Sequence, residues 1–382
     1  MSQFVFEFAT ERHEPALRRL FAESEMEGDI RLSFRREPNY FWATGLFGPF
    51  CQVVVARDTV TGAVIGVGTR AIRDGFINGK IEPIGYLADL RLERRYRSGT
   101  LIVRAYRHLS ELHHDHQVKL YFTLIAEGNR QALDTIASGR AGLPPYHDWG
   151  RLLSPAINLV GRKISRITDA QIVRGAAKML PEIVDCINRN HARRQFAPCY
   201  TLDQFAVTPA NRPGNMDGET RTVRLRDFNI EDFYVAIRGG KIIGVLGKWD
   251  QSRFKQTVVT GYGGNLRVFR PMYNLASKWI GAPSYPSLGE PLRSFYASFI
   301  AVDDDDLNVF RALLRQLYND NLGSGYHYFV VGLHEQDPLA PALADYVQTP
   351  FAARLFLVRF ANGAESFAAL DDRPPYIELA LL

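Results

Sequence analysis

The sequence has few cysteines, no long hydrophobic run and no leader-like start. Its three cysteines, Cys51, Cys186 and Cys199, are odd in number and lack metal-type spacing, which predicts reduced thiols rather than a disulfide framework. No segment approaches the ~20 apolar residues that cross a bilayer, and the first residues do not resemble a secretory signal. We therefore expect a cytoplasmic protein without a membrane partner.

Charge is not concentrated in a basic arm or stripe either. The formal net charge is +5, which favours an anionic ligand. Because the basic residues are dispersed, we expect a small polyphosphate ligand and no nucleic acid. Three histidines, His113, His114 and His116, lie close together, but neighbouring residues on a helix point in different directions, so we expect no metal.

What the sequence does contain is one series of elements that occurs twice. The 382 residues exceed the ~250–300 that one core usually supports. Residues 52–70 predict a β-hairpin, and residues 233–248 repeat its pattern. A strand at 85–92 has its counterpart at 295–302, and a strand with a helix start at 120–133 is matched at 328–343. A repeat about 180 residues apart predicts duplicated domains, which we place at 1–163 and 164–382.

One connection in the first copy has the character of an anion site. Residues 86–92 alternate as a strand, and from Leu101 the apolar residues follow helical spacing, with Ser98 or Thr100 as N-cap. The loop between them, ERRYRSGT at 93–100, is basic and contains a glycine. A helix N-terminus with added arginines suits a pyrophosphate. Residues 271–291, rich in proline and glycine, predict an irregular insertion rather than a helix.

This strand, loop and helix resemble motif A of the GNAT superfamily of N-acetyltransferases. Residues 96–100, YRSGT, match the family's aromatic, arginine and one glycine, but the last small position of the pattern falls on Ile102. Residues 120–132 resemble the family's next strand and helix start, with Asn129 and Ala132 at the matching positions. The resemblance implies an α/β (α+β) chain of two tandem GNAT-like domains. Each would be a mixed, mostly antiparallel twisted sheet flanked by helices.

The resemblance also implies a set of residues around acyl-CoA, with acetyl-CoA as the expected co-substrate. The residues that would bind it are Leu90, Arg91, Leu92, Arg95, Arg97, Ser98, Gly99, Thr100, Leu101 and Asn129. Asp89 is the expected general base, with Glu82 or Glu127 acting through water as alternatives. The family's usual acid, a tyrosine, is replaced by Ile136, so Tyr146 further along is the candidate acid.

The second copy differs where the first has its basic loop. Four consecutive carboxylates, residues 303–306, precede its helix and would repel a pyrophosphate by roughly 4 kcal/mol per close pair at an effective dielectric of 20. We therefore expect this copy not to bind CoA in the usual way.

The expected activity is transfer of an acetyl group to a primary amine of a small molecule or peptide. Two alternatives stay open: transfer of a longer acyl chain, and a non-catalytic acyl-CoA sensor or scaffold. We expect a monomer or a homodimer.

Overall fold

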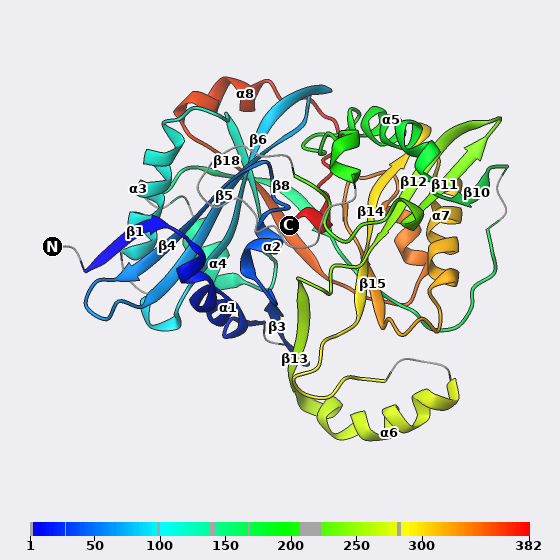
Figure 1. The fold of residues 1–382 in the computed structure, drawn as a ribbon, viewed down its shortest axis with the longest axis horizontal. Coiled ribbons are helices and arrows are strands. Elements are labelled where there is room, and N and C mark those ends of the chain that lie inside the picture. Colours follow the sequence, from blue (N-terminus) through cyan, green and yellow to red (C-terminus); the bar gives the residue numbers. More distant parts are fainter. Residues whose placement is uncertain are drawn as a thin grey trace.

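Two large β-sheets with helices on their faces make up the body of the protein (Figure 1). The computed structural model describes residues 3–26, 28–97, 100–137, 139, 142–166, 169–206, 223–280 and 284–382. Ser98 and Gly99 of the expected pyrophosphate loop lie outside these residues. The predicted mixed α/β architecture is confirmed.

The two halves share a common series of elements, and each has further elements of its own. The first half contains β1 (Phe4–Phe8), α1 (Glu14–Ala22), β2 (Glu25–Met26), β3 (Ile30–Arg35), α2 (Tyr40–Thr44), β4 (Phe50–Asp58), β5 (Val64–Ile77), β6 (Lys80–Leu92), α3 (Leu101–His113), β7 (Leu120–Ala126), α4 (Arg130–Ile136), β8 (Tyr146–Leu153) and β9 (Ala156–Asn158). The second half contains β10 (Gln171–Arg174), α5 (Leu180–His191), β11 (Phe233–Arg238), β12 (Lys241–Trp249), β13 (Gln256–Tyr262), α6 (Gly264–Ile280), β14 (Ser294–Val302), α7 (Leu307–Asp320), β15 (Tyr328–Val331), β16 (Leu333–His334), β17 (Gln348–Thr349), β18 (Ala352–Arg359) and α8 (Ala364–Ala368). The shared series is β1-α1-β4-β5-β6-α3-β7 in the first half and β10-α5-β11-β12-β14-α7-β15 in the second.

The two large sheets have similar strand orders, and each includes strands from the other half of the chain. The first runs β1-β4-β5-β6-β7-β18-β8-β16, and the second runs β10-β11-β12-β14-β15-β9-β17. In each, one parallel pair, β6 with β7 or β14 with β15, interrupts otherwise antiparallel pairing. The strand beyond the parallel pair is β18 in the first sheet and β9 in the second, so each comes from the other half. The boundary at residue 163 stays a prediction, and three strands, β9, β16 and β18, lie in the sheet of the other half.

Helices bury apolar stripes on both faces of the first sheet. Leu17 and Phe21 of α1 pack with Val53 and Val55 of β4 on one face. On the other face, Leu101 of α3 packs against Ala56 and Ile65. The alternation along β4 sends neighbouring side chains to opposite faces, which is why one strand contributes to both cores.

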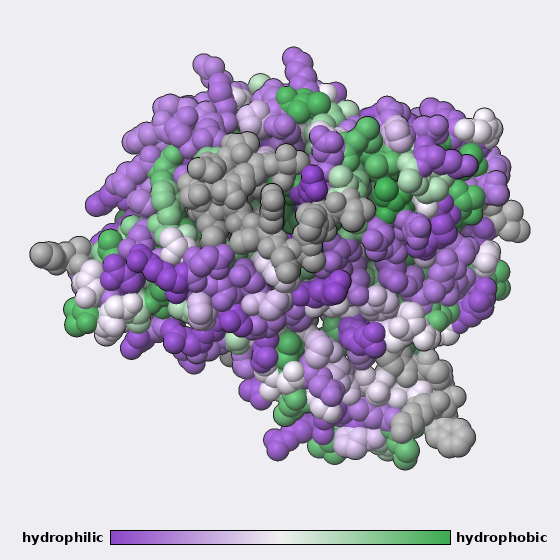
Figure 2. All heavy atoms as spheres, in the orientation of Figure 1, coloured by the Kyte–Doolittle hydropathy of each residue, from purple (hydrophilic) through white to green (hydrophobic). Residues whose placement is uncertain are grey.

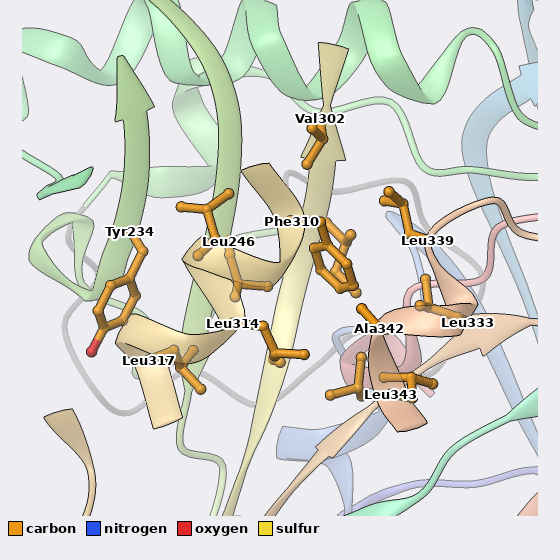
Figure 3. Packing of buried hydrophobic residues seen from close by; sticks show 14 of the residues in the cluster. Tyr234, Leu246, Val302, Phe310, Leu314, Leu317, Leu333, Leu339, Ala342 and Leu343 are labelled. Atoms are coloured by element: carbon orange, nitrogen blue, oxygen red, sulfur yellow. The ribbon is translucent and has the colours of Figure 1, made fainter. Parts of the chain in front are cut away.

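The second sheet builds its core in the same way. The apolar face of α7 supplies Phe310, Leu314 and Leu317, which pack toward Leu246 and Val302 of the sheet (Figure 3). Residues 333–343, with Leu333, Leu339, Ala342 and Leu343, close the other side of this cluster.

The expectation of an irregular insertion at 271–291 was wrong for its first part. Residues 264–280 form α6, and Pro271 lies inside it. The helix begins seven residues before the proline, and Tyr273 and Asn274 on its inner side contact Tyr285. Within the described ranges, no helix is long and apolar enough to cross a membrane.

Candidate functional site

A cavity of about 280 Å³ lies between α3 and the first sheet, where β6 and β7 separate. The two strands pair only at Gly85 with Tyr121 and at Tyr86 with Phe122. A Cβ on Gly85 would come within 2.0 Å of the Tyr121 ring, so this close contact requires glycine. Beyond it the two strands are no longer paired, and the cavity opens there. Most of the cavity wall is apolar.

Several predicted site residues meet in this cavity. Its wall includes Asp89, Leu90, Arg91 and Leu92 of β6, Asn129 at the start of α4, and Tyr146 of β8. The other predicted residues with described positions, Arg95, Arg97, Thr100 and Leu101, are not part of the wall. Leu101 is instead buried in the core beneath α3.

A β-bulge interrupts β6 at the centre of the site. Val67 pairs with Arg91 and Thr69 with Ala88, so Asp89 and Leu90 together face the single residue Gly68. Asp89 has a left-handed backbone, with φ of 56°. A bulge takes backbone groups out of the regular ladder and turns them toward a neighbour or a ligand. Among the described residues, no side chain hydrogen-bonds to the backbone N–H of Asp89 or Leu90.

The Asp89 carboxylate is held by two buried donors. Arg36 Nη2 donates to Oδ1 at 2.8 Å, and Tyr40 OH donates to Oδ2 at 2.9 Å. Arg36 follows β3 and Tyr40 begins α2, so both lie on the face opposite α3. Burial and the nearby Asp89 charge raise the pKa of Tyr40 well above its usual value, so its hydroxyl stays a donor. Sequence reasoning missed both partners, because nothing in the local pattern links them to Asp89.

Two tyrosines face each other at the other side of the cavity. Tyr146 OH contacts the Tyr106 OH of α3, and both side chains line the wall. Burial raises the pKa of Tyr106 to about 12 and that of Tyr146 well above 10.0. Both hydroxyls therefore remain protonated. Asn129 caps α4, since its side chain accepts a hydrogen bond from Ala132 N at 3.1 Å.

The basic loop before α3 presents exposed arginines. Arg97 Nε donates to Leu92 O at 3.0 Å, and Arg95 lies over the Tyr96 ring while its Nε donates to Glu93. Tyr96 OH donates to Asp58 Oδ2 at 3.0 Å and so ties the loop to β4. The alternative bases are less well placed. Glu127 forms an ion pair with Arg151, and Glu82 lies seven residues before Asp89 on β6, a distance of about 23 Å along a strand.

The second copy has the same bulge, but there side chains bind the backbone N–H groups of the bulge. Val245 pairs with Ala301 and Gly247 with Ser298, so Phe299 and Ile300 face Leu246, and Phe299 has φ of 57°. Here both backbone N–H groups are occupied. The Phe299 N–H donates to Glu378 Oε2 at 2.7 Å, and the Ile300 N–H donates to Tyr376 OH at 3.2 Å. Burial raises the pKa of Glu378.

The acidic stretch before α7 lies at the helix start, as predicted, and is largely neutralised. Asp306 caps α7 by accepting from Asn308 N and Val309 N. Asp303 pairs with Arg189, and Asp305 pairs with Arg193 and Arg194. The space beside it, near Ile300 and Tyr376, measures only about 10 Å³. Sequence reasoning found the carboxylates but not the arginines of and beyond α5 that bind them.

Comparison with known proteins gives matches in structure only. No family model and no curated protein matches the sequence. Among solved structures, Saccharomyces cerevisiae N-myristoyltransferase with bound myristoyl-CoA is similar over 94% of this chain and 83% of its own, at 11% identity and a TM-score of 0.58. A second structure of that protein, with myristoyl-CoA and inhibitors, has a TM-score of 0.61 at 11% identity, over 94% of this chain and 80% of its own.

A bacterial protein matches over the whole length. The GCN5-related N-acetyltransferase from Sphaerobacter thermophilus covers 100% of this chain and 99% of its own, at 10% identity and a TM-score of 0.53. At such identities the likeness concerns the fold. The chain has the GNAT fold in two tandem copies.

Proposed function

We propose that the chain is an acyl-CoA-dependent N-acyltransferase whose first copy accepts acyl chains longer than acetyl. The observation that carries the proposal is the reach of the cavity. It extends from Asn129 and Tyr146 beside β7, under α3, to Phe6 of β1 and Val54 of β4. Because neighbouring strands lie about 4.8 Å apart, the distance from β7 to β4 is about 14 Å. An acetyl group would fill only the mouth of this space.

The lining supports a hydrocarbon ligand. Leu87, Leu90, Leu92, Leu109 and Leu112 face the cavity. Small residues leave it open: a Cβ on Gly68 would meet only Leu90 Cδ1, at 3.8 Å. Burying apolar chain surface in such a space contributes about 0.8 kcal/mol per methylene. The myristoyl-CoA bound by the yeast N-myristoyltransferase is a precedent within this fold.

The bulge of β6 supplies the site for the thioester oxygen. In the second copy, the equivalent N–H of Phe299 donates to a carboxylate oxygen, that of Glu378. This internal contact is a precedent for an accepting oxygen at the bulge. In the first copy, the N–H groups of Asp89 and Leu90 would stabilise the oxyanion that develops on the thioester carbon.

The transfer is a direct one. The amine nitrogen of the acceptor attacks the thioester carbon, the C–S bond breaks, and the CoA thiolate leaves. Asp89 takes the proton that the amine loses, and Tyr146 donates a proton to the thiolate. Arg95, Arg97 and the residues up to Leu101 hold the CoA pyrophosphate at the start of α3. The acceptor is a primary amine of a small molecule or a peptide.

The second copy does not bind acyl-CoA in this proposal. Glu378 and Tyr376 occupy its bulge, and the acidic stretch stands where the first copy has arginines. One acyl-CoA per chain is the expected stoichiometry.

Isothermal calorimetry with acetyl-, octanoyl- and palmitoyl-CoA tests the proposal. We expect one site per chain and an affinity that rises with chain length. An Arg95→Ala, Arg97→Ala variant should bind about tenfold or more weakly, because charge-assisted hydrogen bonds to phosphate are lost. The matched control is Arg12→Ala, Arg19→Ala, two exposed arginines of the α1 region, which should bind as the wild type does.

Turnover is measured by release of free CoA thiol with a panel of amines. Equal affinity for all three chain lengths would favour acetyl transfer. Tight binding without thiol release for any amine would favour a sensor or scaffold. No binding of any acyl-CoA would refute the proposed function.

A further inference from the structure

Helix α6 projects away from the two sheets, on an excursion between β13 and β14 (Figure 1). It is the yellow-green helix at the bottom of that view. Its inner side contacts the returning chain. Asn274 exchanges two hydrogen bonds with the backbone of Tyr285, at 2.9 and 2.8 Å, and the Tyr273 ring lies 4.8 Å from that of Tyr285.

The side of α6 that faces solvent is apolar. Val268, Phe269, Met272 and Leu275 are exposed to 73%, 52%, 64% and 66%. Their spacing of one, four and seven residues places them on one face of a helix. Ser277, by contrast, is buried, and Arg270 stacks over the Tyr262 ring on the inner side. Green atoms appear along the lower edge of this lobe in Figure 2. The usual arrangement of a surface helix, apolar in and polar out, is reversed.

Such a helix is poorly supported by the chain itself. Pro271 lies in its interior and costs a backbone hydrogen bond. In proteins, most helical stability comes from packing an apolar face against something, and this face packs against nothing among the described residues. We therefore expect the exposed apolar face of α6 to pack against something outside the chain.

We propose that α6 docks the protein on the surface of an anionic membrane. The sequence from residue 264 to 289 contains Arg267, Arg270 and Lys278 and no Asp or Glu, and of these Arg267 lies exposed on α6. An apolar helix face with only basic charges suits the headgroup region of anionic lipid. A second copy of the chain fits less well, because two such segments would bring like charges together. The inference departs from the expectation of no membrane partner, and it is independent of the acyl-CoA site.

Flotation of the full-length protein with lipid vesicles tests the inference without acyl-CoA. One set is phosphatidylcholine alone and the other contains phosphatidylglycerol as well. We expect binding to the anionic vesicles to be about fivefold tighter, because Arg267 attracts the anionic headgroups, and we expect it to weaken with salt. A Val268→Ser, Met272→Ser, Leu275→Ser variant should lose binding by about tenfold or more.

The matched control replaces three exposed apolar residues elsewhere, Val60→Ser, Ile81→Ser and Val347→Ser. It should bind anionic vesicles as the wild type does. All six side chains are exposed, so both variants should fold, which circular dichroism checks. Absence of wild-type binding to anionic vesicles, or equal binding by the α6 variant, would overturn the proposal. So would a wild-type dimer that the α6 variant converts to a monomer, since a second copy would then cover the helix.

Discussion

Asp89 and Phe299 occupy the same position in the two copies. Each is the first residue of a bulge, with φ of 56° and 57°, on the strand that precedes the copy's parallel partner. The two copies differ in the side chain at this position. Asp89 binds Arg36 and Tyr40, whereas Phe299 stacks on Trp249 in a core. The same β-bulge thus borders an open cavity in the first copy, whereas in the second copy it is covered by buried side chains.

Replacing Asp89 by asparagine tests its role as base. Asp89→Asn preserves the shape and removes the proton acceptor, so we expect kcat/KM to fall about a hundredfold while acyl-CoA affinity stays unchanged. The matched control is Arg36→Gln, which leaves the carboxylate in place and removes its ion-pair partner. Steady-state kinetics across pH compare the two. Equal losses in both variants would assign Asp89 to anchoring Arg36 rather than to catalysis.

Filling the cavity at Gly68 should shorten the accepted acyl chain. Gly68→Leu places a side chain into the space beside Leu90, where a Cβ meets no close atom. We expect affinity for palmitoyl-CoA to fall about tenfold or more and that for acetyl-CoA to change little. Calorimetry with both ligands measures the ratio. A uniform loss for both would mean that the substitution disturbs the fold and not the chain site.

Comparing Tyr→Phe variants of the contacting residues Tyr106 and Tyr146 tests whether Tyr146 is the general acid or only a structural hydroxyl. Either Tyr→Phe substitution removes the same contact. If Tyr146 protonates the thiolate, Tyr146→Phe should lower kcat by about tenfold or more, and Tyr106→Phe should lower it less. Single-turnover release of CoA thiol is the measurement. Identical behaviour of the two variants would remove Tyr146 from the acid role.

Buried His191 should make stability depend on pH below neutrality. Burial lowers the pKa of His191 to about 4, and its Nδ1 lies 2.8 Å from Pro198 O. The unfolded chain binds the proton near pH 6.5 and the folded chain only near 4, so stability is lost as pH falls through this window. The loss amounts to about 3 kcal/mol.

Urea unfolding of the wild type and of His191→Asn at pH 7 and pH 4 measures this contribution. The variant lacks the titrating group, so its free energy of unfolding should fall less on acidification, by about 3 kcal/mol. A parallel decline in both proteins would show that other groups cause the acid sensitivity.

The elements of the first copy could be predicted because their signals are local. Alternation in 86–92 and helical spacing from Leu101 predicted the end of β6 and the start of α3 as observed, although β6 begins earlier, at Lys80. Asn129 and Tyr146 were predicted as site residues and do line the cavity. The extent of the cavity could not be predicted, because its lining residues lie on several strands and helices that come together only in the folded protein.

The contacts that define the site could not be predicted. Arg36 lies 53 residues before Asp89, and Glu378 lies 79 residues after Phe299. A bulge adds one residue to a strand without changing its composition, so residue alternation does not reveal it. At residues 271–280 the local proline signal predicted an irregular segment, whereas these residues belong to α6, which contacts Tyr285.

The exchange of β9 and β18 has a consequence for how the protein is made. During synthesis β7 leaves the ribosome more than two hundred residues ahead of its neighbour β18. The first sheet therefore waits with one edge unpaired until nearly all of the sequence has emerged. Pairings between such distant segments form slowly, and unpaired strand edges invite aggregation. The nascent chain should depend on a holding chaperone, and severing it between the halves should leave two fragments that are insoluble alone and recover their fold only when translated together.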